Sequence, residues 1–453
     1  MTEINGGGFK GAASTDLKRV TVAQINVDGQ PASFALNDDR TLLEWLRQEV
    51  GAVSARMSCD SASCGSCAVL VNGVPTKACT VLLRTTVGAK VQTLDGYEAQ
   101  AAGPAPLLEE LSGSSVFQCV YCKPAFVFAA KSLLERDEQP SRQDIQAAFN
   151  GLMCRCTGYQ MIVEAVERVA KSASPIEDTA ALAHTEPDHR PRTVVDALEL
   201  ASTLSGARWL AGGQQLIPLL TNQAAPVAAL VEIGGIDALL QIDLQDWRLT
   251  IGAASTHAEI AASSQIREAL PALAQLASEV GDVYLRLRGT LGGSIVGAPQ
   301  KGSYSSFLIA ADALITTAER RVNAESWIKE LSVVTSQAHS ELIVGIELPL
   351  PLRAFHLAFR PRPARPALVG ISAVQTRKGI LRIGISGYAR EPFLAADAQA
   401  VLQAIARNVN SEELALTLGV APLCDVEATA AYRTAILRQL LRRFQDTYKL
   451  WTD

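Results

Sequence analysis

The nine residues CDSASCGSC at positions 59–67 bring three cysteines into one short loop. Together with a fourth cysteine they read C-x4-C-x2-C-x11-C, and the members are Cys59, Cys64, Cys67 and Cys79. The residues between the first three are small, so the loop can wrap closely around a bound group and point its N–H groups at sulfur atoms. The stretch therefore predicts a metal–thiolate site.

A second set of four cysteines follows with its own spacing, C-x2-C-x31-C-x-C. Its members are Cys119, Cys122, Cys154 and Cys156. Each pair precedes a predicted helix, and two helix N-termini that converge give a positive field that favours thiolates. Four thiolates are what one two-iron, two-sulfur (2Fe-2S) cluster needs. Two such sets predict two clusters, and therefore a protein through which electrons pass.

Zinc is the alternative occupant of these sites. Structural zinc prefers paired knuckles with about two to four intervening residues, and an isolated cysteine after a hairpin suits it poorly. The C-x4-C-x2-C…C run is instead the spacing of plant-type ferredoxins. We favour iron–sulfur clusters, and a zinc-stapled interaction protein remains the alternative.

The elements predicted around the first set are typical of a β-grasp ferredoxin. Asp28-Gly29 and Asn72-Gly73 predict two hairpins, because such dipeptides favour tight hairpin turns. Thr41 and Glu44 have the spacing of a capping box and predict the start of a helix. The predicted order is hairpin, helix, cysteine loop, hairpin and last strand, at 20–36, 41–51, 57–67, 68–77 and 91–94.

The residue pattern changes twice in the rest of the chain. Helical patterns at 123–135, 141–149 and 160–170 predict a small helical module around the second cysteine set. A polar, acidic segment follows and predicts a linker. Beyond it short strands and helices alternate, and an amphipathic helix ends the sequence.

Two glycine-rich segments stand out in this second half, at 211–215 and 289–294. Gly212-Gly213 and Gly292-Gly293 predict turns whose bare N–H groups can face a pyrophosphate, since no Cβ blocks its approach. Ordinary tight turns are the alternative interpretation.

The composition argues against several classes of protein. The 453 residues carry a net charge of −5, which gives no reason to expect nucleic-acid binding. No run of about 18 apolar residues occurs, so we expect no membrane-spanning helix. The first residues lack an apolar export segment, so we expect a cytoplasmic protein whose thiols stay reduced.

The motifs resemble those of the xanthine oxidase family of molybdenum hydroxylases. CDSASCGSC at 59–67, QCVYCKP at 118–124 and MCRCTGYQ at 153–160 are similar to its iron–sulfur subunits, with a first motif like that of the carbon monoxide dehydrogenase branch. AGGQQLIPLL at 211–220, GTLGGS at 289–294 and ELIVGIELP at 341–349 are similar to its flavin subunit. The order of the parts resembles the small subunit of bacterial xanthine dehydrogenases.

The resemblance implies an α+β multidomain fold and its boundaries. The expected parts are a flexible tail at 1–18, a β-grasp 2Fe-2S ferredoxin domain at 19–98, a four-helix 2Fe-2S domain at 99–172, a linker at 173–188, an α+β FAD-binding domain of the PCMH type at 189–355 and a C-terminal α+β domain at 356–453. The expected FAD-binding residues are Ala211, Gly212, Gly213, Gln214, Gln215, Leu216, Thr290, Gly292, Gly293 and Ser294.

The resemblance also implies the partners and the function. A separate large subunit would hold the molybdenum pterin cofactor, and Gln118 and Cys156 would face that pterin. Electrons would pass from molybdenum through both clusters to FAD and on to an external acceptor, within a higher hetero-oligomer. The chain itself would be an oxidoreductase subunit with no catalytic residue acting on the substrate.

One stretch departs from the family. Residues 295–303 lack the acidic side chains that the family uses to hold the sugar portion of the flavin, and Lys301 brings the opposite charge. The alternative function is therefore an iron–sulfur subunit whose flavin-like domain has lost FAD and serves as a scaffold or docking domain. The five histidines have no H-x-x-x-H spacing, and we assign none of them to a site.

Overall fold

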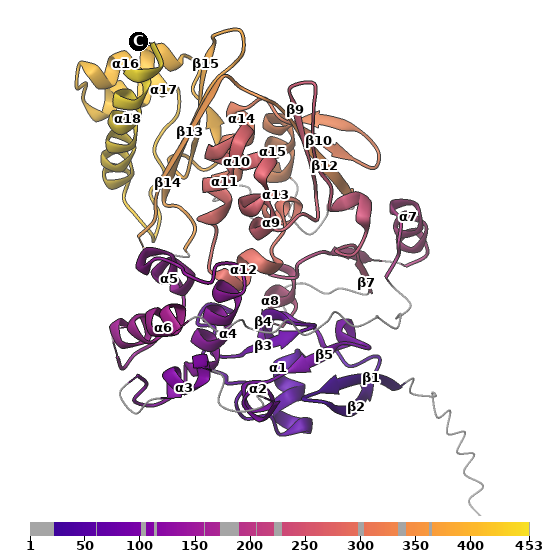
Figure 1. Cartoon of the computed structure of the whole chain (residues 1–453). Helices are drawn as coiled ribbons and strands as arrows, with labels where there is room; N and C mark the ends of the chain where they lie inside the picture. Colours follow the sequence, from indigo (N-terminus) through magenta and orange to yellow (C-terminus); the bar gives the residue numbers. More distant parts are fainter. Residues whose placement is uncertain are drawn as a thin grey trace, which may run out of the picture.

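The structure is a computed structural model. It describes residues 22–59, 61–100, 106–112, 116–157, 159–172, 190–204, 206–221, 229–297, 303–333, 341–361 and 365–452. The tail and linker expected at 1–18 and 173–188, and Lys301, lie outside these residues. Figure 1 shows the N-terminal elements in the lower part of the molecule and the later sheets in the upper part. In the described part of the chain, no helix has the length and hydropathy needed to cross a membrane.

The first sheet has the strand order β2-β1-β5-β3-β4. Both predicted hairpins form, with Asp28-Gly29 and Asn72-Gly73 at positive φ in their turns. The last strand is shorter than predicted, because Leu94 already starts a helix. The elements are β1 (Val22–Val27), β2 (Gln30–Ala35), α1 (Leu42–Trp45), η1 (Leu46–Val50), β3 (Ala68–Val71), β4 (Val74–Lys77), η2 (Ala78–Thr80), η3 (Leu83–Thr86), β5 (Lys90–Gln92) and α2 (Leu94–Gln100).

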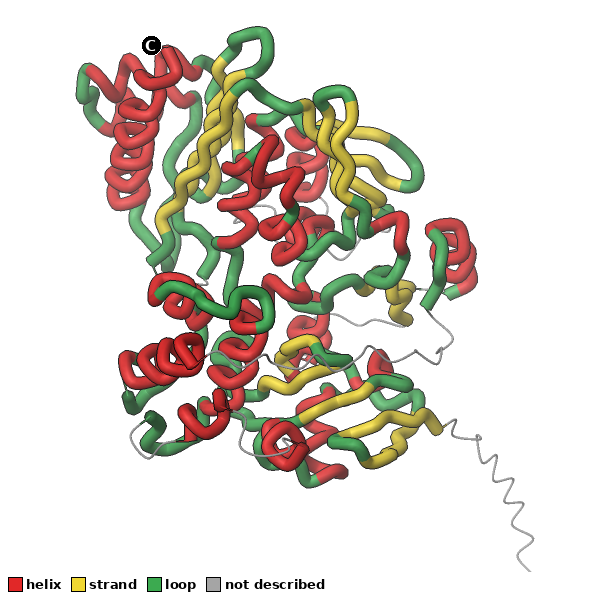
Figure 2. The backbone as a smooth tube through the Cα atoms, in the orientation of Figure 1, coloured by secondary structure: helices red, strands yellow, loops and turns green. Residues whose placement is uncertain are grey.

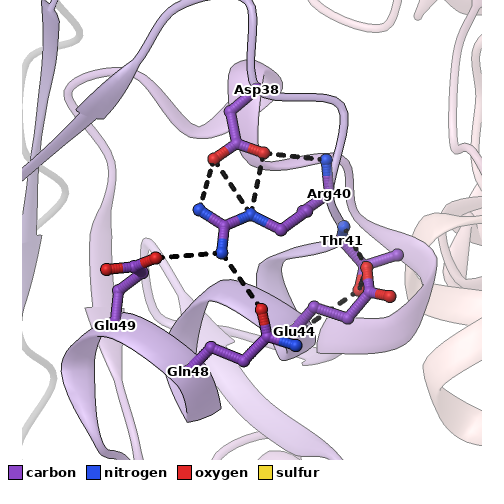
Figure 3. Close-up of polar contacts among 6 residues, drawn as sticks. All are labelled: Asp38, Arg40, Thr41, Glu44, Gln48 and Glu49. Carbon is purple, nitrogen blue, oxygen red and sulfur yellow. Dashed lines mark hydrogen bonds and ion pairs between the residues drawn. The ribbon is translucent and has the colours of Figure 1, made fainter.

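Paired polar groups hold the start of α1 (Figure 3). Thr41 Oγ1 accepts from the N–H of Glu44 at 3.2 Å, and the Glu44 carboxylate accepts from the N–H of Thr41 at 2.8 Å. Arg40 donates to Asp38 at 2.7 Å and to Glu49 at 3.1 Å. The Arg40 guanidinium lowers the pKa of Asp38 below its ordinary value. The predicted capping box is confirmed, and it fixes the entry of the helix that packs on the first sheet.

The second cysteine set lies in a module made only of helices. The Phe126 and Phe128 side chains of its central helix are fully buried, and the other helices and β3 surround that helix. Pro124 lies in its first turn, and Ser141 caps the next helix. The helices are α3 (Pro106–Ser112), α4 (Lys123–Leu134), α5 (Arg142–Phe149) and α6 (Gln160–Ser172).

The next part contains a two-stranded parallel sheet, β6-β7, and an antiparallel sheet of order β11-β10-β12-β9-β8. Its elements are α7 (Val194–Thr203), β6 (Ala207–Leu210), α8 (Leu216–Thr221), β7 (Ala229–Glu232), η4 (Asp237–Leu239), β8 (Ile242–Gln245), β9 (Arg248–Gly252), α9 (His257–Ala262), α10 (Ser264–Ala269), α11 (Pro271–Ser278), α12 (Val283–Arg288), α13 (Leu291–Gly297), α14 (Ser303–Ala310), β10 (Leu314–Thr317), β11 (Arg321–Asn323), α15 (Ala324–Val333) and β12 (Ile343–Pro349). The turn predicted at 289–294 is wrong beyond Thr290, because α13 begins at Leu291.

The C-terminal part is an antiparallel sheet of order β13-β14-β15-β16 covered by helices, as the backbone tube in Figure 2 shows. The boundary expected between 355 and 356 falls inside β13, and the one expected between 98 and 99 falls inside α2. A boundary within a hydrogen-bonded element would break its backbone pairing. The elements are β13 (Arg353–Phe359), β14 (Val369–Gln375), β15 (Leu381–Ser386), β16 (Phe393–Leu394), α16 (Ala398–Ala406), α17 (Ser411–Leu418) and α18 (Ala430–Thr452).

Arg433 of α18 fastens this last helix to the sheet. Its guanidinium is buried and donates to the carbonyls of Leu368 and Gly387 at 2.9 and 2.6 Å. It also donates to both carboxylate oxygens of Asp425 at 2.7 and 2.8 Å. Its removal would leave two carbonyls and one carboxylate without this donor.

We expect Arg433→Met to lower the free energy of unfolding of the C-terminal part by about 3 kcal/mol, since it removes charged hydrogen bonds from buried acceptors. Arg443→Met is the control, because Arg443 is exposed on the same helix. Chemical denaturation followed by circular dichroism measures the difference. Equal stability of the two variants would contradict the assignment.

Candidate functional site

The first cysteine set is arranged as two pairs. Cys59 lies against Cys64, and Cys67 lies against Cys79, which the second hairpin brings back toward the loop. A hydrogen bond from the Cys64 thiol lowers the pKa of Cys59 to about 3. A hydrogen bond from the Cys79 thiol likewise lowers the pKa of Cys67. In each pair, one thiol therefore favours the thiolate form of the other.

Backbone N–H groups of the loop point at these sulfur atoms, as the small residues predicted. The Ser66 N–H donates to Cys64 Sγ at 3.4 Å, and the N–H groups of Ser61 and Ser63 also lower the pKa of Cys59. The N–H of Ala78 donates to the carbonyl of Cys67 at 3.1 Å and joins the loop to η2. The N–H groups of the three serines stabilise negative charge on the sulfurs.

The second set is also arranged as two pairs. The sulfur atoms of Cys119 and Cys156 are 3.5 Å apart, and Cys122 and Cys154 are hydrogen-bonded through their thiols. The Tyr121 N–H, followed by the Cys156 thiol, lowers the pKa of Cys119. Burial opposes the Cys154 thiolate, but the Thr157 hydroxyl and N–H outweigh it and lower the pKa of Cys154.

The pairing of the thiols bears on which metal could bind. In a 2Fe-2S cluster the four protein ligands are divided two and two between the irons, whereas one zinc ion takes all its ligands in a single tetrahedron. Each set shows the two-and-two division. The donor chemistry fits iron–sulfur clusters.

The two cysteine loops touch each other. The N–H of Met153, next to Cys154, donates to the carbonyl of Cys64 at 3.3 Å. Gly65 lies in the same contact at φ +81°, and a Cβ there would be 2.9 Å from Leu152 and 3.2 Å from Ala125. Only glycine allows this approach. A backbone contact therefore links the second cysteine set to the first.

The glycine-rich segments face one cavity of about 350 Å³. This volume is within the range of small-molecule and cofactor sites, roughly 300–1,000 Å³. All ten residues predicted to bind FAD line it: Ala211, Gly212, Gly213, Gln214, Gln215, Leu216, Thr290, Gly292, Gly293 and Ser294. Two segments that are far apart in the sequence therefore line the same cavity.

The first glycine segment, 211–215, suits a bound anion. Within the described residues, the backbone N–H groups of Gly212, Gly213, Gln214 and Gln215 donate to no protein acceptor. Gly212 lies so close to the backbone before Gly289 that a Cβ would be 1.8 Å from the Arg288 carbonyl oxygen. This segment has the open donors and the tight backbone approach that the pyrophosphate of a dinucleotide requires.

The cavity also adjoins the first cysteine set. The Gln214 amide donates to Thr80 Oγ1 at 3.2 Å, and Thr80 directly follows Cys79. Sequence reasoning did not predict this contact, because the two residues are 134 positions apart.

Comparison with known proteins agrees with this arrangement. Residues 19–101 match the family described as a 2Fe-2S iron-sulfur cluster binding domain, and 93–167 match the 2Fe-2S binding domain. Residues 185–351 match the FAD binding domain in molybdopterin dehydrogenase. The nicotinate dehydrogenase small FeS subunit of Eubacterium barkeri is 32% identical over 150 residues, which are 33% of this chain and 94% of that protein.

The chain belongs to the xanthine oxidase family of molybdenum hydroxylases. It is an electron-transfer subunit with two 2Fe-2S domains and an FAD-binding domain.

One further relative and one solved structure are similar to a longer part of this hydroxylase subunit. The 6-hydroxypseudooxynicotine dehydrogenase complex subunit alpha of Paenarthrobacter nicotinovorans is 29% identical over 271 residues, 55% of this chain and 91% of that protein. A structure of reconstituted CO dehydrogenase from Oligotropha carboxidovorans has a TM-score of 0.50 at 25% identity, covering 56% of this chain and 94% of that one. Each relative is matched almost completely by part of this hydroxylase subunit, which is longer than either.

The second glycine segment of the hydroxylase subunit does not behave as predicted. The N–H of Gly292 donates to the Ala253 carbonyl at 2.8 Å, and that of Gly293 donates to Thr290 Oγ1 at 3.1 Å. Neither is a bare donor, because one is bonded to Ala253 and the other to the residue that precedes α13. Gly292 instead permits close packing, since a Cβ there would be 2.9 Å from the Ala253 oxygen.

Sequence reasoning missed a buried histidine in the cavity wall. His257 lies between Tyr304 and Ser294, with its Nδ1 3.1 Å from the Tyr304 hydroxyl and its Nε2 3.2 Å from Ser294 Oγ. Burial, and then the nearby Arg286 charge, lower the pKa of His257 to about 3, so the ring is neutral near pH 7. No spacing signal marked this residue, because its partners come from distant elements.

We expect Gly212→Ala to abolish FAD binding while both 2Fe-2S domains remain intact. The new methyl would collide with the Arg288 carbonyl and move the open N–H donors. Gly235→Ala is the matched control, because a Cβ there meets nothing within 4 Å. Acid-released flavin per chain measures the effect, and full flavin content in the Gly212 variant would contradict the placement.

Proposed function

We propose that this subunit carries electrons from a molybdenum centre on a large partner subunit to an external acceptor. The second cysteine set holds the first cluster on the route, the first cysteine set holds the next, and FAD in the cavity follows. The observation that carries the proposal is an unbroken series of contacts between these three sites. Electron transfer weakens steeply with distance, so adjacent sites are what such a relay needs.

The ligands of the proposed clusters are the eight paired cysteines. Cys59 and Cys64 would share one iron and Cys67 and Cys79 the other, because these are the thiols in contact. The same reasoning gives the pairs 119 with 156 and 122 with 154. Binding of the irons requires the thiolate form and releases the protons of the thiols.

The proposed relay has two protein contacts. The hydrogen bond from Met153 to Cys64 joins the two cysteine sets at 3.3 Å. The hydrogen bond from Gln214 to Thr80 joins the first set to the FAD cavity at 3.2 Å. FAD, when bound, supplies a carrier that takes electrons one at a time and passes them on in pairs.

The surface around the second set supports a large partner subunit. Gln118 and Cys119 are exposed, and so are apolar side chains in or next to the two cysteine sets: Met57, Val120, Tyr121 and Met153, at 52, 45, 42 and 60% exposure. Such a patch next to a redox site fits a partner that covers it. We propose that the molybdenum pterin of that subunit approaches Gln118 and Cys156, within a higher hetero-oligomer in the cytoplasm.

The domains of the proposed subunit follow its separate cores. We propose the ferredoxin domain near 19–100, which keeps α2 whole, the helical domain near 101–172, the FAD-binding domain from 189 and the C-terminal domain from about 353, where β13 begins. Four clusters of buried side chains, each drawn mostly from one of these parts, support this division.

A second candidate is an iron–sulfur subunit whose flavin-like domain serves as a scaffold. It is favoured by one observation, that the N–H groups of Gly292 and Gly293 are already bonded within the protein. Flavin released by acid at about one per chain from the native complex would exclude this candidate. A native complex with about four iron atoms per chain and no releasable flavin would establish this candidate.

We expect the purified chain to contain about four iron atoms, two for each cluster. Cys59→Ser and Cys156→Ser should each lose one cluster, and therefore about half of the iron, and each should abolish a different electron paramagnetic resonance signal. Cys424→Ser is the control, because this exposed cysteine belongs to neither set. Zinc in place of iron, or identical losses in both variants, would contradict the ligand assignment.

A further inference from the structure

A buried ion pair joins the ferredoxin domain to the FAD-binding domain. Lys77, the last residue of β4, donates to Asp282 at 2.7 Å across 205 positions of sequence. Both side chains are almost fully buried, at 3 and 6% exposure. Two charges are rarely withdrawn from water in this way unless each has a close partner, because desolvation is costly.

The Lys77 ammonium also reaches into the first cysteine loop. It donates to the carbonyl of Ala62 at 2.7 Å, midway between Cys59 and Cys64. Ala62 has φ +55°, a conformation that a residue with a Cβ rarely adopts. Lys77 therefore holds a strained turn of the loop that surrounds the proposed cluster.

Lys77 is the member of the pair that lies beside the cysteines. It stands two residues before Cys79 in the chain, and its ammonium donates to Ala62 inside the loop that carries Cys59 and Cys64. Asp282 belongs to the start of α12 in the FAD-binding domain. The positive member of the pair is thus the one nearer to the cluster site.

Asp282 connects the pair to the flavin cavity. It caps α12 by accepting from the N–H of Leu285 at 3.0 Å, and α12 ends at the carbonyl of Arg288 that packs on Gly212. Tyr284 of the same helix donates to the carbonyl of Ala125 in the helical domain. Figure 1 shows α12 in the middle of the molecule, between the lower domains and the upper ones.

We propose that Lys77 is a positioning residue that sets the reduction potential of the ferredoxin-type cluster and that Asp282 moderates its effect. Reduction adds a negative charge to the cluster, and a fixed ammonium nearby stabilises the reduced form. The Asp282 carboxylate offsets part of that stabilisation. The inference rests on the proposed function, because it requires a cluster bound by Cys59, Cys64, Cys67 and Cys79.

The proposal predicts shifts of opposite sign for the two partners. Lys77→Met should lower the midpoint potential of the ferredoxin-type cluster, and Asp282→Asn should raise it. The potential of the other cluster should stay unchanged in both. Titration of the full chain, followed by the electron paramagnetic resonance signal of each cluster, measures these potentials. General loosening of the fold would instead shift the midpoint potential of the cluster in the same direction in both variants.

A double variant keeps the test decisive if a single variant fails to fold. Lys77→Met with Asp282→Asn leaves no unpaired buried charge, so it should fold better than either single variant. Since Lys77 is nearer to the cluster, the double variant should still have a lowered potential. An unchanged potential in it, or shifts of equal sign in the single variants, overturns the proposal.

Two controls separate this inference from the proposed function. Lys329→Met makes the same chemical change in an exposed ion pair with Glu325 and should leave both potentials unchanged. If the wild-type chain contains iron but neither the Lys77 nor the Asp282 variant has a shifted midpoint potential, only the role of the pair is refuted. Wild-type chain that lacks iron refutes the proposed function itself.

Discussion

The buried helix α12 is the element on which the arrangement of the molecule depends. Its first turn is paired with Lys77 of the ferredoxin domain, its Tyr284 hydroxyl is bonded to the helical domain, and its last carbonyl packs on the flavin loop. These contacts are out of water, where an unpaired charge or hydroxyl is costly. The three domains can therefore separate only if buried polar groups lose their partners together.

This constraint explains why the cysteine sets lie at edges of their domains. The loop 59–67 is held on one side by the hairpin that carries Cys79 and on another by Leu152 and Ala125 of the helical domain. Cys119 and Cys156 lie instead on the outer surface, with exposed apolar neighbours. One set is thus enclosed between domains, whereas the other faces outward, which suits a relay with an inner and an outer end.

Much of the fold was predictable because its signals are local. Turn dipeptides, a capping box and the cysteine spacings each act within a few residues, and the structure confirms the hairpins and the start of α1. The glycine segment at 289–294 was misread, because Gly292 serves helix packing against Ala253, which is distant in sequence. His257 and the Lys77–Asp282 pair were missed for the same reason, since their partners come from other elements.

The link between the two cysteine loops consists of main-chain atoms alone, the N–H of Met153 and the carbonyl of Cys64. Every amino acid except proline at 153 supplies the same donor, and every amino acid at 64 supplies the same acceptor. Substitutions at 64 and 153 other than proline at 153 therefore leave this hydrogen bond in place. Insertion or deletion of a residue in either loop would shift the register of the two backbones, so selection must preserve loop length together with Gly65.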